Sequence, residues 1–339
     1  MARDIVQSPY LEGHSAGNAF RREYARSVST LVERKKADAQ RERDQYASKI
    51  ARDREGCRED LKAILGWPLT VAERGAPFAR KTEIFSDAAM RIFRVQLEVF
   101  ADFWFYGLLF EHTDKGKLPL VISQHGGLGT PELCSSFFDS GNYNDMSMRI
   151  FAKGVNVFAP QLLLWAEGEF GEDPHRAALD NELRRLGGSI AALEIHCLMR
   201  SLDWLEKWEK FGGSFGMIGL SYGGFYALYT AALDKRIRAA LDCSFFQDGT
   251  RCFGSDFAWP GAARQFGDAE AGALVCPRAL RIEVGNADEL DCVFGAQNEF
   301  VRLERYYQSA RDALSFAVFD GGHEFCPADD GIRWVLERL

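Results

Sequence analysis

The sequence has little that would suit a membrane or a nucleic acid. No stretch approaches the about 18 uninterrupted apolar residues that a membrane helix requires, and the amino terminus, MARDIVQSPYLEGHSAG, lacks the basic start and apolar run of a secretory signal. The 41 Lys and Arg residues stand against 49 Asp and Glu, and this net charge of -8 argues against a phosphate-binding surface. We therefore expect a cytoplasmic protein, or one whose leader has been removed, with a small-molecule partner and no nucleic-acid or membrane partner.

The sequence also lacks regularly spaced cysteines. The chain contains no C-x-x-C pair, so neither a zinc knuckle nor a small disulfide framework is indicated, and we expect reduced thiols. The acidic stretch 161–182 contains His175, but its irregular spacing does not favour a metal site. The eight scattered cysteines are Cys57, Cys134, Cys197, Cys243, Cys252, Cys276, Cys292 and Cys326.

The chain begins with a charged segment that the sequence predicts to be helical. Residues 20–63 are rich in helix formers, contain no proline and carry acidic residues among the basic ones, which favours a solvated helix face. Gly-Trp-Pro at 66–68 ends the segment. We divide the chain into an N-terminal helical extension, residues 1–68, and one larger α/β domain, residues 69–339. The helix could exchange between subunits of a homo-oligomer or cover an edge of the core, and both arrangements stay open.

After Pro68 the pattern changes to that of strands. Three β-branched and aromatic runs with alternation indicate antiparallel strands, and six short apolar runs, most of them separated by enough chain for a helix, indicate parallel strands buried on both faces. The clearest helix is predicted over residues 188–211. The antiparallel candidates are residues 82–87, 91–100 and 103–112; the parallel candidates are residues 118–124, 155–160, 215–220, 237–244, 279–285 and 314–320. The fold class is therefore α/β, with a mostly parallel sheet, antiparallel first strands and flanking helices.

Three serines occur in the pattern Gly-x-Ser-x-Gly. Ser221 follows an apolar strand and precedes Gly223, Gly224 and a helix-forming run, the strand, turn and helix order that lifts a nucleophilic hydroxyl out of the backbone. Ser214 has the reverse order, which indicates a connecting turn, and Ser15 precedes any strand and is predicted to cap a helix. We therefore assign the nucleophile to Ser221.

An acid and a base follow in the order that such a serine requires. Asp288 lies in the loop directly after the strand of residues 279–285, where open α/β sheets assemble their sites. Asp291 and, more weakly, Glu289 compete with it, and we favour Asp288 because it lies nearer the strand end. His323 follows the last strand between flexible glycines and is the candidate general base.

A glycine loop supplies the candidate oxyanion hole. Residues 125–129, HGGLG, directly follow a buried strand, and glycines allow backbone amides to face the negative charge that acyl transfer builds on a carbonyl oxygen. The candidate donors are the amide of Tyr222 and that of Gly127 or Leu128. In the same loop His125, next to Gly126, is expected to orient the loop beside the substrate and not to act as a base.

With GLSYGG, GNAD, GGHEF and HGG in this order, the chain resembles the α/β-hydrolase superfamily. More narrowly, over roughly residues 60–339, it is similar to the bacterial esterases grouped with dienelactone hydrolases and acetyl xylan or cephalosporin C deacetylases. The resemblance implies a serine carboxylester hydrolase with no metal or organic cofactor, whose catalytic domain is residues 69–339. The HGG run departs from the HGGG of some relatives at Leu128, which leaves the oxyanion donor open.

The resemblance leaves the substrate less defined. We expect a small soluble ester, of short-chain acetyl type or with a small aryl group. The stretch 243–261 is a candidate roof of the pocket, and core packing is the competing explanation for its aromatic residues. Residues 161–182 are the other candidate rim of the pocket. Two alternatives are a peptidase or amidase of the same fold and a catalytically silent binding module. The candidate substrate-binding residues are His125, Gly126, Phe245, Phe246, Phe257 and Trp259.

Overall fold

The structure is a computed structural model that describes residues 12–67, 75–249, 255–290 and 293–339. Its strands are β1 Phe78–Ser86, β2 Met90–Phe100, β3 Phe103–His112, β4 Leu118–Gln124, β5 Asn156–Pro160, β6 Phe211–Leu220, β7 Ile237–Cys243, β8 Ala279–Gly285 and β9 Leu314–Phe319. Its α-helices are α1 Asn18–Arg52, α2 Arg54–Leu65, α3 Met146–Ala152, α4 Arg176–Arg185, α5 Ile190–Leu205, α6 Tyr222–Leu233, α7 Asp268–Val275, α8 Val293–Glu304 and α9 Asp330–Leu336.

One sheet runs through the molecule, in the strand order β1-β2-β3-β5-β4-β6-β7-β8-β9. The pairs β1/β2, β2/β3 and β3/β5 are antiparallel, and every later pair is parallel. The predicted α/β class with antiparallel first strands is confirmed. All parallel strands end at one edge of the sheet, so the loops after β4, β6, β8 and β9 gather at that edge.

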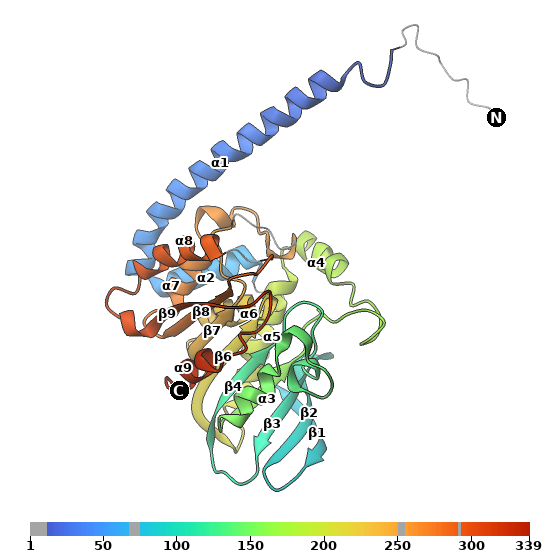
Figure 1. The fold of residues 1–339 in the computed structure, drawn as a ribbon, viewed down its shortest axis with the longest axis vertical. Coiled ribbons are helices and arrows are strands. Elements are labelled where there is room, and N and C mark those ends of the chain that lie inside the picture. The colour runs from blue at the N-terminus through green and yellow to red at the C-terminus, as the bar shows by residue number, and fades with distance from the viewer. Residues whose placement is uncertain (1–11, 68–74, 250–254, 291–292) are drawn as a thin grey trace, which may run out of the picture.

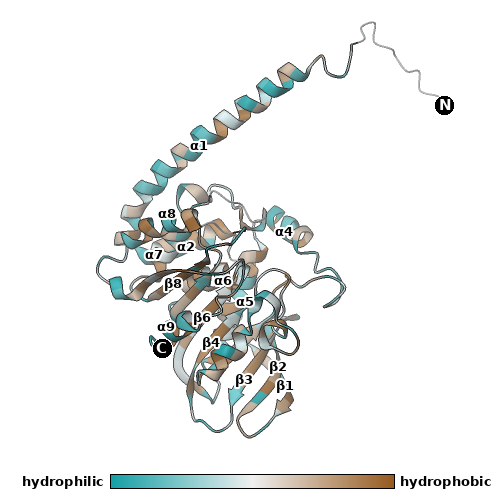
Figure 2. Cartoon of the chain, in the orientation of Figure 1, coloured by the Kyte–Doolittle hydropathy of each residue, from teal (hydrophilic) through white to brown (hydrophobic). Residues whose placement is uncertain are grey.

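Helices cover both faces of the sheet, as Figure 1 shows. One buried cluster joins the sheet to α2, α5, α6 and α7, and a second joins its other face to α3 and α9. The central strands are buried along most of their length because each is covered on both sides. Figure 2 shows these strands as the hydrophobic interior, whereas the length of α1 is largely hydrophilic.

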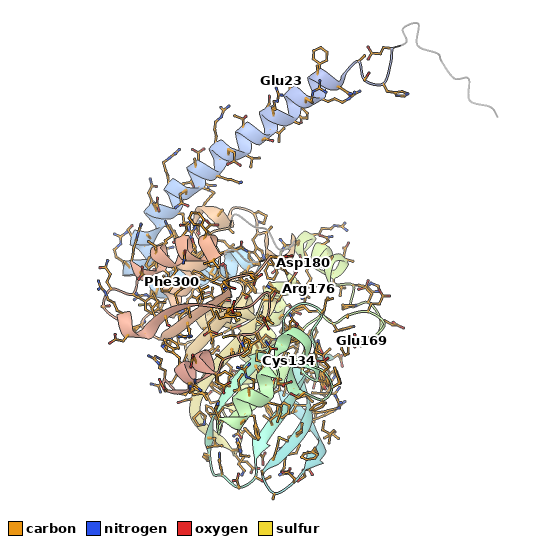
Figure 3. All side chains as sticks on the ribbon, viewed as in Figure 1. Glu23, Cys134, Glu169, Arg176, Asp180 and Phe300 are labelled. Carbon is orange, nitrogen blue, oxygen red and sulfur yellow. The ribbon has the colours of Figure 1, made fainter. Side chains whose placement is uncertain are left out.

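The N-terminal segment forms two helices instead of one, because the chain breaks at Asp53, whose side chain accepts a hydrogen bond from the Gly56 amide and caps α2. The first turns of α1 project away from the body (Figures 1 and 3), and its last turns pack against the body. Within the described ranges, no helix is long and apolar enough to cross a bilayer. The predicted boundary at residue 68 lies outside the described residues and stays a prediction.

Three local predictions are wrong. The helix expected to reach residue 211 ends at Leu205, and β6 begins at Phe211, because Phe211 already pairs with Leu118 of β4. Ser214 consequently lies inside β6 and not in a turn. Ser15 does not cap α1 with its side chain; its carbonyl oxygen accepts from the Asn18 amide at 2.9 Å.

The described cysteines carry free thiols, as expected from their scattered spacing. Their side chains are buried in the two apolar clusters or beside them, where they pack as small hydrophobic groups. Cys252 and Cys292 lie outside the described residues. The six that the structure describes are Cys57, Cys134, Cys197, Cys243, Cys276 and Cys326.

Candidate active site

Ser221 occupies a sharp turn between β6 and α6. Its backbone has φ 57° and ψ -123°, a conformation that a residue with a side chain adopts only under strain of about 1–3 kcal/mol. The Ser221 amide donates to the carbonyl oxygen of Cys243 at the end of β7, at 2.7 Å, and this bond helps to hold the turn. Such a strand, turn and helix arrangement lifts the serine hydroxyl out of the backbone.

Two glycines make this tight turn possible. A Cβ atom on Gly219 would collide with the backbone of Gly223, and a Cβ atom on Gly223 would collide with the carbonyl oxygen of Gln124 at the end of β4. A larger residue at Gly219 would therefore push α6 away from β6, and one at Gly223 would push α6 away from β4. The sequence motif Gly-x-Ser-x-Gly thus follows from close backbone approach on both sides of Ser221.

Asp288 and His323 form a hydrogen-bonded pair. Nδ1 of His323 lies 2.9 Å from Oδ2 and 3.1 Å from Oδ1 of Asp288, whose side chain is fully buried. A carboxylate only accepts hydrogen bonds, so Nδ1 carries the proton and Nε2 is left as the basic nitrogen. The Leu290 amide also donates to Oδ1, at 2.8 Å, which fixes the carboxylate. Glu289 is exposed, and Asp291 lies outside the described residues.

Ser221 and His323 lie on neighbouring loops at the same edge of the sheet. Cys243 contacts both loops: its carbonyl oxygen accepts from the Ser221 amide, and its Sγ donates to the carbonyl oxygen of Glu324 at 3.5 Å. Oγ of Ser221 makes no hydrogen bond to any described residue. Contacts between a nucleophile and its base commonly tighten only when the substrate binds.

The HGGLG loop lies directly against this turn. A Cβ atom on Gly126 would come within 3.0 Å of the Ser221 Cβ, and one on Gly127 would face the Tyr222 ring at 3.8 Å. Among the described residues, the Gly127 amide has no hydrogen-bond acceptor. The Tyr222 amide begins α6, where amides have no acceptor within the helix. Two amide donors are therefore available beside Ser221.

His125 lies behind this loop, fully buried. Its Nδ1 is 2.9 Å from the carbonyl oxygen of Gly126, and its Nε2 accepts from the Leu162 amide at 2.9 Å. Burial lowers the pKa of His125 to about 4, so the ring is neutral near pH 7. Because both ring nitrogens are occupied, His125 can hold the loop to the chain after β5.

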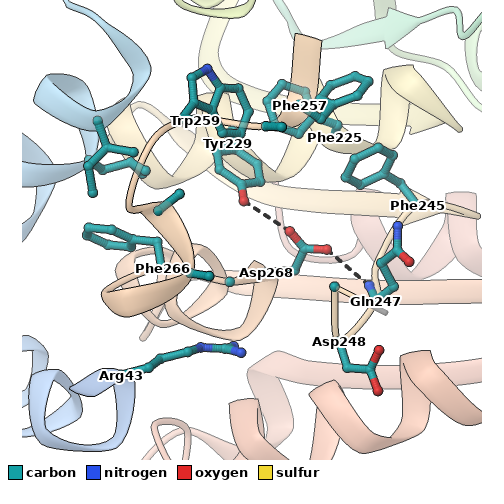
Figure 4. Close-up of a pocket in the computed structure, with 17 residues that line it drawn as sticks. Arg43, Phe225, Tyr229, Phe245, Gln247, Asp248, Phe257, Trp259, Phe266 and Asp268 are labelled. Carbon is teal, nitrogen blue, oxygen red and sulfur yellow. Dashed lines mark hydrogen bonds between the residues drawn. The ribbon is translucent and has the colours of Figure 1, made fainter. Parts of the chain in front are cut away.

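Figure 4 shows a cavity of about 300 Å³ that borders α6 at Phe225, a residue one helical turn after Ser221 in the chain. The rings of Phe225, Phe245, Phe257 and Trp259 line it, and the Tyr222 ring packs edge-on against Phe257 at 4.6 Å. Three of the four aromatic candidates thus gather here. Phe246 does not line this cavity and is fully buried in the core.

Polar atoms face the same cavity. Asp268 accepts from the Tyr229 hydroxyl and from the Gln247 amide, both at 3.0 Å (Figure 4), and burial raises the pKa of Asp268 to about 7. The side-chain oxygen of Gln247, a residue that is 93% buried, and the indole N–H of Trp259 are buried and have no hydrogen-bond partner among the described residues. A mainly apolar ligand with one or two polar groups would suit this wall.

Sequence reasoning named residues 161–182 as a candidate rim of the pocket but missed a second cavity, of about 650 Å³, that part of this stretch helps to line. Its wall includes Trp104, Trp165 and Phe170, and Trp165 forms a backbone bridge with Leu128. Arg176, at the start of α4, fixes the chain after β5 by donating hydrogen bonds of 2.8 Å to Glu194 and to Asp256. Figure 3 shows Arg176 on the side of α4 that faces the body. No motif marks these residues, because they come from four separate segments.

The segment around Tyr143 was missed as well. The Tyr143 hydroxyl accepts from the Gly126 amide at 3.1 Å and donates to the Gly127 carbonyl oxygen at 2.9 Å. The Asn142 side chain donates to the carbonyl oxygen of His323 at 3.0 Å. These contacts span up to 181 residues of sequence, so no local pattern could have indicated them. Among the described residues, no group of three His, Cys, Asp or Glu side chains could hold a metal ion.

Comparison with known proteins agrees with this architecture. No family model matches the chain. It is 26% identical over 229 residues to YtaP of Bacillus subtilis (strain 168), a protein named as a hydrolase, in a match covering 62% of this chain and 74% of YtaP.

Two solved structures are similar in fold. The glucuronoyl esterase from Solibacter usitatus has a TM-score of 0.62 and 14% identity, over 82% of this chain and 91% of that one. Acetyl xylan esterase 1 from Thermoanaerobacterium sp. JW/SL YS485 has a TM-score of 0.55 and 16% identity, over 82% and 93%. The chain therefore has the α/β-hydrolase fold.

Proposed function

We propose that the chain is a serine carboxylester hydrolase that forms an acyl-enzyme on Ser221. One observation carries the proposal: a serine in a strained turn lies at the sheet edge where a buried carboxylate holds an imidazole through Nδ1, while its Nε2 bonds to no residue that the structure describes. The similarity to esterases of this fold supports the same class of reaction.

In the proposed reaction, Nε2 of His323 removes the hydroxyl proton of Ser221 as Oγ attacks the ester carbonyl carbon. The amides of Tyr222 and of Gly127 or Leu128 stabilise the oxyanion, and each such donor is typically worth about 3 kcal/mol in the transition state. His323 then protonates the departing alcohol, and an acyl-enzyme remains. Water, deprotonated by His323, attacks the acyl carbonyl carbon and the bond to Oγ of Ser221 breaks. His323 returns the proton to Oγ, and the acid is released.

We further propose that the ester carries a short acyl chain or a small aryl group. The 300 Å³ cavity begins at Phe225, one helical turn from Ser221, and its aromatic wall would take an apolar group of a substrate held at Ser221. A Phe257→Ala variant should raise KM for phenyl-bearing esters more than for methyl acetate. Phe300→Ala, which removes a half-buried ring packed on Phe316 away from this cavity, is the matched control.

The test of the reaction class compares the parent with Ser221→Ala. Short-chain nitrophenyl esters should be cleaved by the parent only, and a fluorophosphonate probe should label the parent at Ser221. Faster hydrolysis of aminoacyl nitroanilides than of esters would point to the peptidase alternative. Equal ester turnover by both forms would remove Ser221 from the mechanism, and a parent that is neither active nor labelled would be a silent module.

A further inference from the structure

The segment Ser140–Asp145 contacts two parts of the proposed site that are far apart in sequence. It lies between the loop after β4 and α3, and Gly141, Asn144 and Asp145 all have left-handed backbone conformations, with φ of 54°, 47° and 53°. A residue with a side chain keeps that conformation only where contacts with its surroundings hold it there. One of these contacts is a hydrogen bond of 3.0 Å from the Asp145 amide to the Ser140 hydroxyl.

One side of this segment holds the oxyanion loop through Tyr143. The Tyr143 hydroxyl is inserted into the loop, where it accepts from the Gly126 amide and donates to the Gly127 carbonyl oxygen. The side chain is 98% buried, and burial raises the pKa of Tyr143 well above its usual value, so the hydroxyl remains a donor. A Cβ atom on Gly129 would collide with this hydroxyl, which explains the last glycine of HGGLG.

This contact sets the direction of a candidate oxyanion donor. In a trans peptide the C=O and N–H groups point in opposite directions. Because Tyr143 holds the Gly127 carbonyl, the N–H of the same peptide, which belongs to Leu128, points away from Tyr143. Without the hydroxyl, that peptide would lose the hydrogen bond that fixes its carbonyl group.

The other side of the segment holds the histidine loop. The Asn142 side chain donates to the His323 carbonyl oxygen at 3.0 Å, and the Asn142 carbonyl accepts from the Phe325 amide at 2.8 Å. The Asn144 side chain donates to the Glu324 carboxylate at 2.8 Å and to the Phe325 carbonyl oxygen at 2.7 Å. Asn142 and Asn144 therefore hold three consecutive residues, 323–325, of the loop that carries the proposed base.

We propose that Ser140–Asp145 is the element that sets the proposed oxyanion hole and the proposed base relative to each other, with Tyr143 and Asn142 as positioning residues. The inference rests on the proposed esterase function. Neither side chain touches the reacting atoms; each acts through the backbone it holds. Misplacement of a catalytic group by about 1 Å can cost about 100-fold in rate, so the loss of one of these bonds should act on kcat.

The test compares Tyr143→Phe with Tyr307→Phe. Both changes remove one buried hydroxyl that donates to a backbone carbonyl: Tyr307 is 99% buried and donates to Arg278 at 3.0 Å, away from the site. Tyr143→Phe should lower kcat on a nitrophenyl acetate about 10- to 100-fold with KM within about threefold, because the lost restraint matters in the transition state. Inhibition by a boronic acid that mimics the tetrahedral intermediate should weaken in parallel. Tyr307→Phe should keep kcat within about twofold at a similar loss of thermal stability.

The outcomes separate the inference from the function. If the parent and Tyr307→Phe lack esterase activity and phosphonate labelling, the proposed function fails. If they are active and Tyr143→Phe matches them in kcat, the positioning role is overturned. Should Tyr143→Phe not fold, the exposed Asn142 provides the second variant: Asn142→Ala should lower kcat at least about fivefold with unchanged KM. Unchanged kcat in that variant overturns the role too.

Discussion

Replacement of Asp288 by Asn tests whether this carboxylate sets which ring nitrogen of His323 carries the proton. Oδ1 of Asp288 accepts from the Leu290 amide, so the single oxygen of Asn would remain with that donor. The NH2 group would then take the place of Oδ2, which faces Nδ1 of His323 at 2.9 Å. An NH2 group donates only, so Nδ1 would have to accept, and the proton would move to Nε2, the nitrogen that must be free to take the proton of Ser221.

The size of the expected loss in kcat/KM follows from the same geometry. A full charge pair at 2.9 Å is worth about 5–6 kcal/mol at an effective dielectric constant of about 20, and the Asn variant loses this stabilisation of the imidazolium formed in the reaction. At 1.36 kcal/mol per factor of ten, this corresponds to about 10⁴-fold in kcat/KM. Loss of the carboxylate in a serine protease triad has an effect of the same size.

The assay is hydrolysis of a short-chain nitrophenyl ester by the parent and the variants. Asp320→Asn is the matched control, because this exposed residue directly follows β9, lies three residues from His323 and loses the same charge without touching the imidazole. It should keep kcat/KM within about twofold. If Asp288→Asn is folded and retains more than about a tenth of the parental rate, the assignment of the acid is wrong. Loss of activity in Asp291→Asn instead would identify the competing carboxylate.

Two further predictions concern stability. Arg43 joins α1 to the buried carboxylates Glu270 and Glu299, so Arg43→Met should lower the free energy of unfolding in urea by about 3–5 kcal/mol. Arg41→Met, which removes an exposed ion pair one half-turn away, should cost at most about 1 kcal/mol, and equal losses would contradict a buried network. The pKa of Asp268 is about 7 when folded and near 3.8 when unfolded, so the parent should lose stability as pH rises through this window. The free energy of unfolding of the parent should fall by on the order of 4 kcal/mol between pH 4 and 8, and that of Asp268→Asn should not. If the parent and the variant differ by the same unfolding free energy at both pH values, the raised pKa of Asp268 is refuted.

Local sequence patterns determined the fold class and the order of the elements. The runs 103–112, 118–124 and 279–285 coincide with β3, β4 and β8, because alternating and continuous apolar patterns report burial on one face or on two. The turn at Ser221 was predictable for a similar reason: its glycines and the flanking strand and helix patterns all lie within a few residues of one another. Such patterns do not locate element ends that depend on pairing, which is why the helix expected to reach residue 211 ends earlier and Ser214 lies in β6.

Only the tertiary structure decided which side chains meet at the sheet edge. The sequence favoured Asp288, but the contact of its carboxylate with His323 exists because β8 and β9 are neighbours in the sheet. Phe246 belongs to the same aromatic run as Phe245, yet the end of β7 turns one ring into the core and the other toward the cavity. Tyr143 carries no recognisable signal, since its two partners are defined by the packing of distant segments. Local propensity acts over a few residues, whereas the alignment of donors and acceptors across the sheet edge is fixed by contacts between parts of the chain that the sequence order keeps far apart.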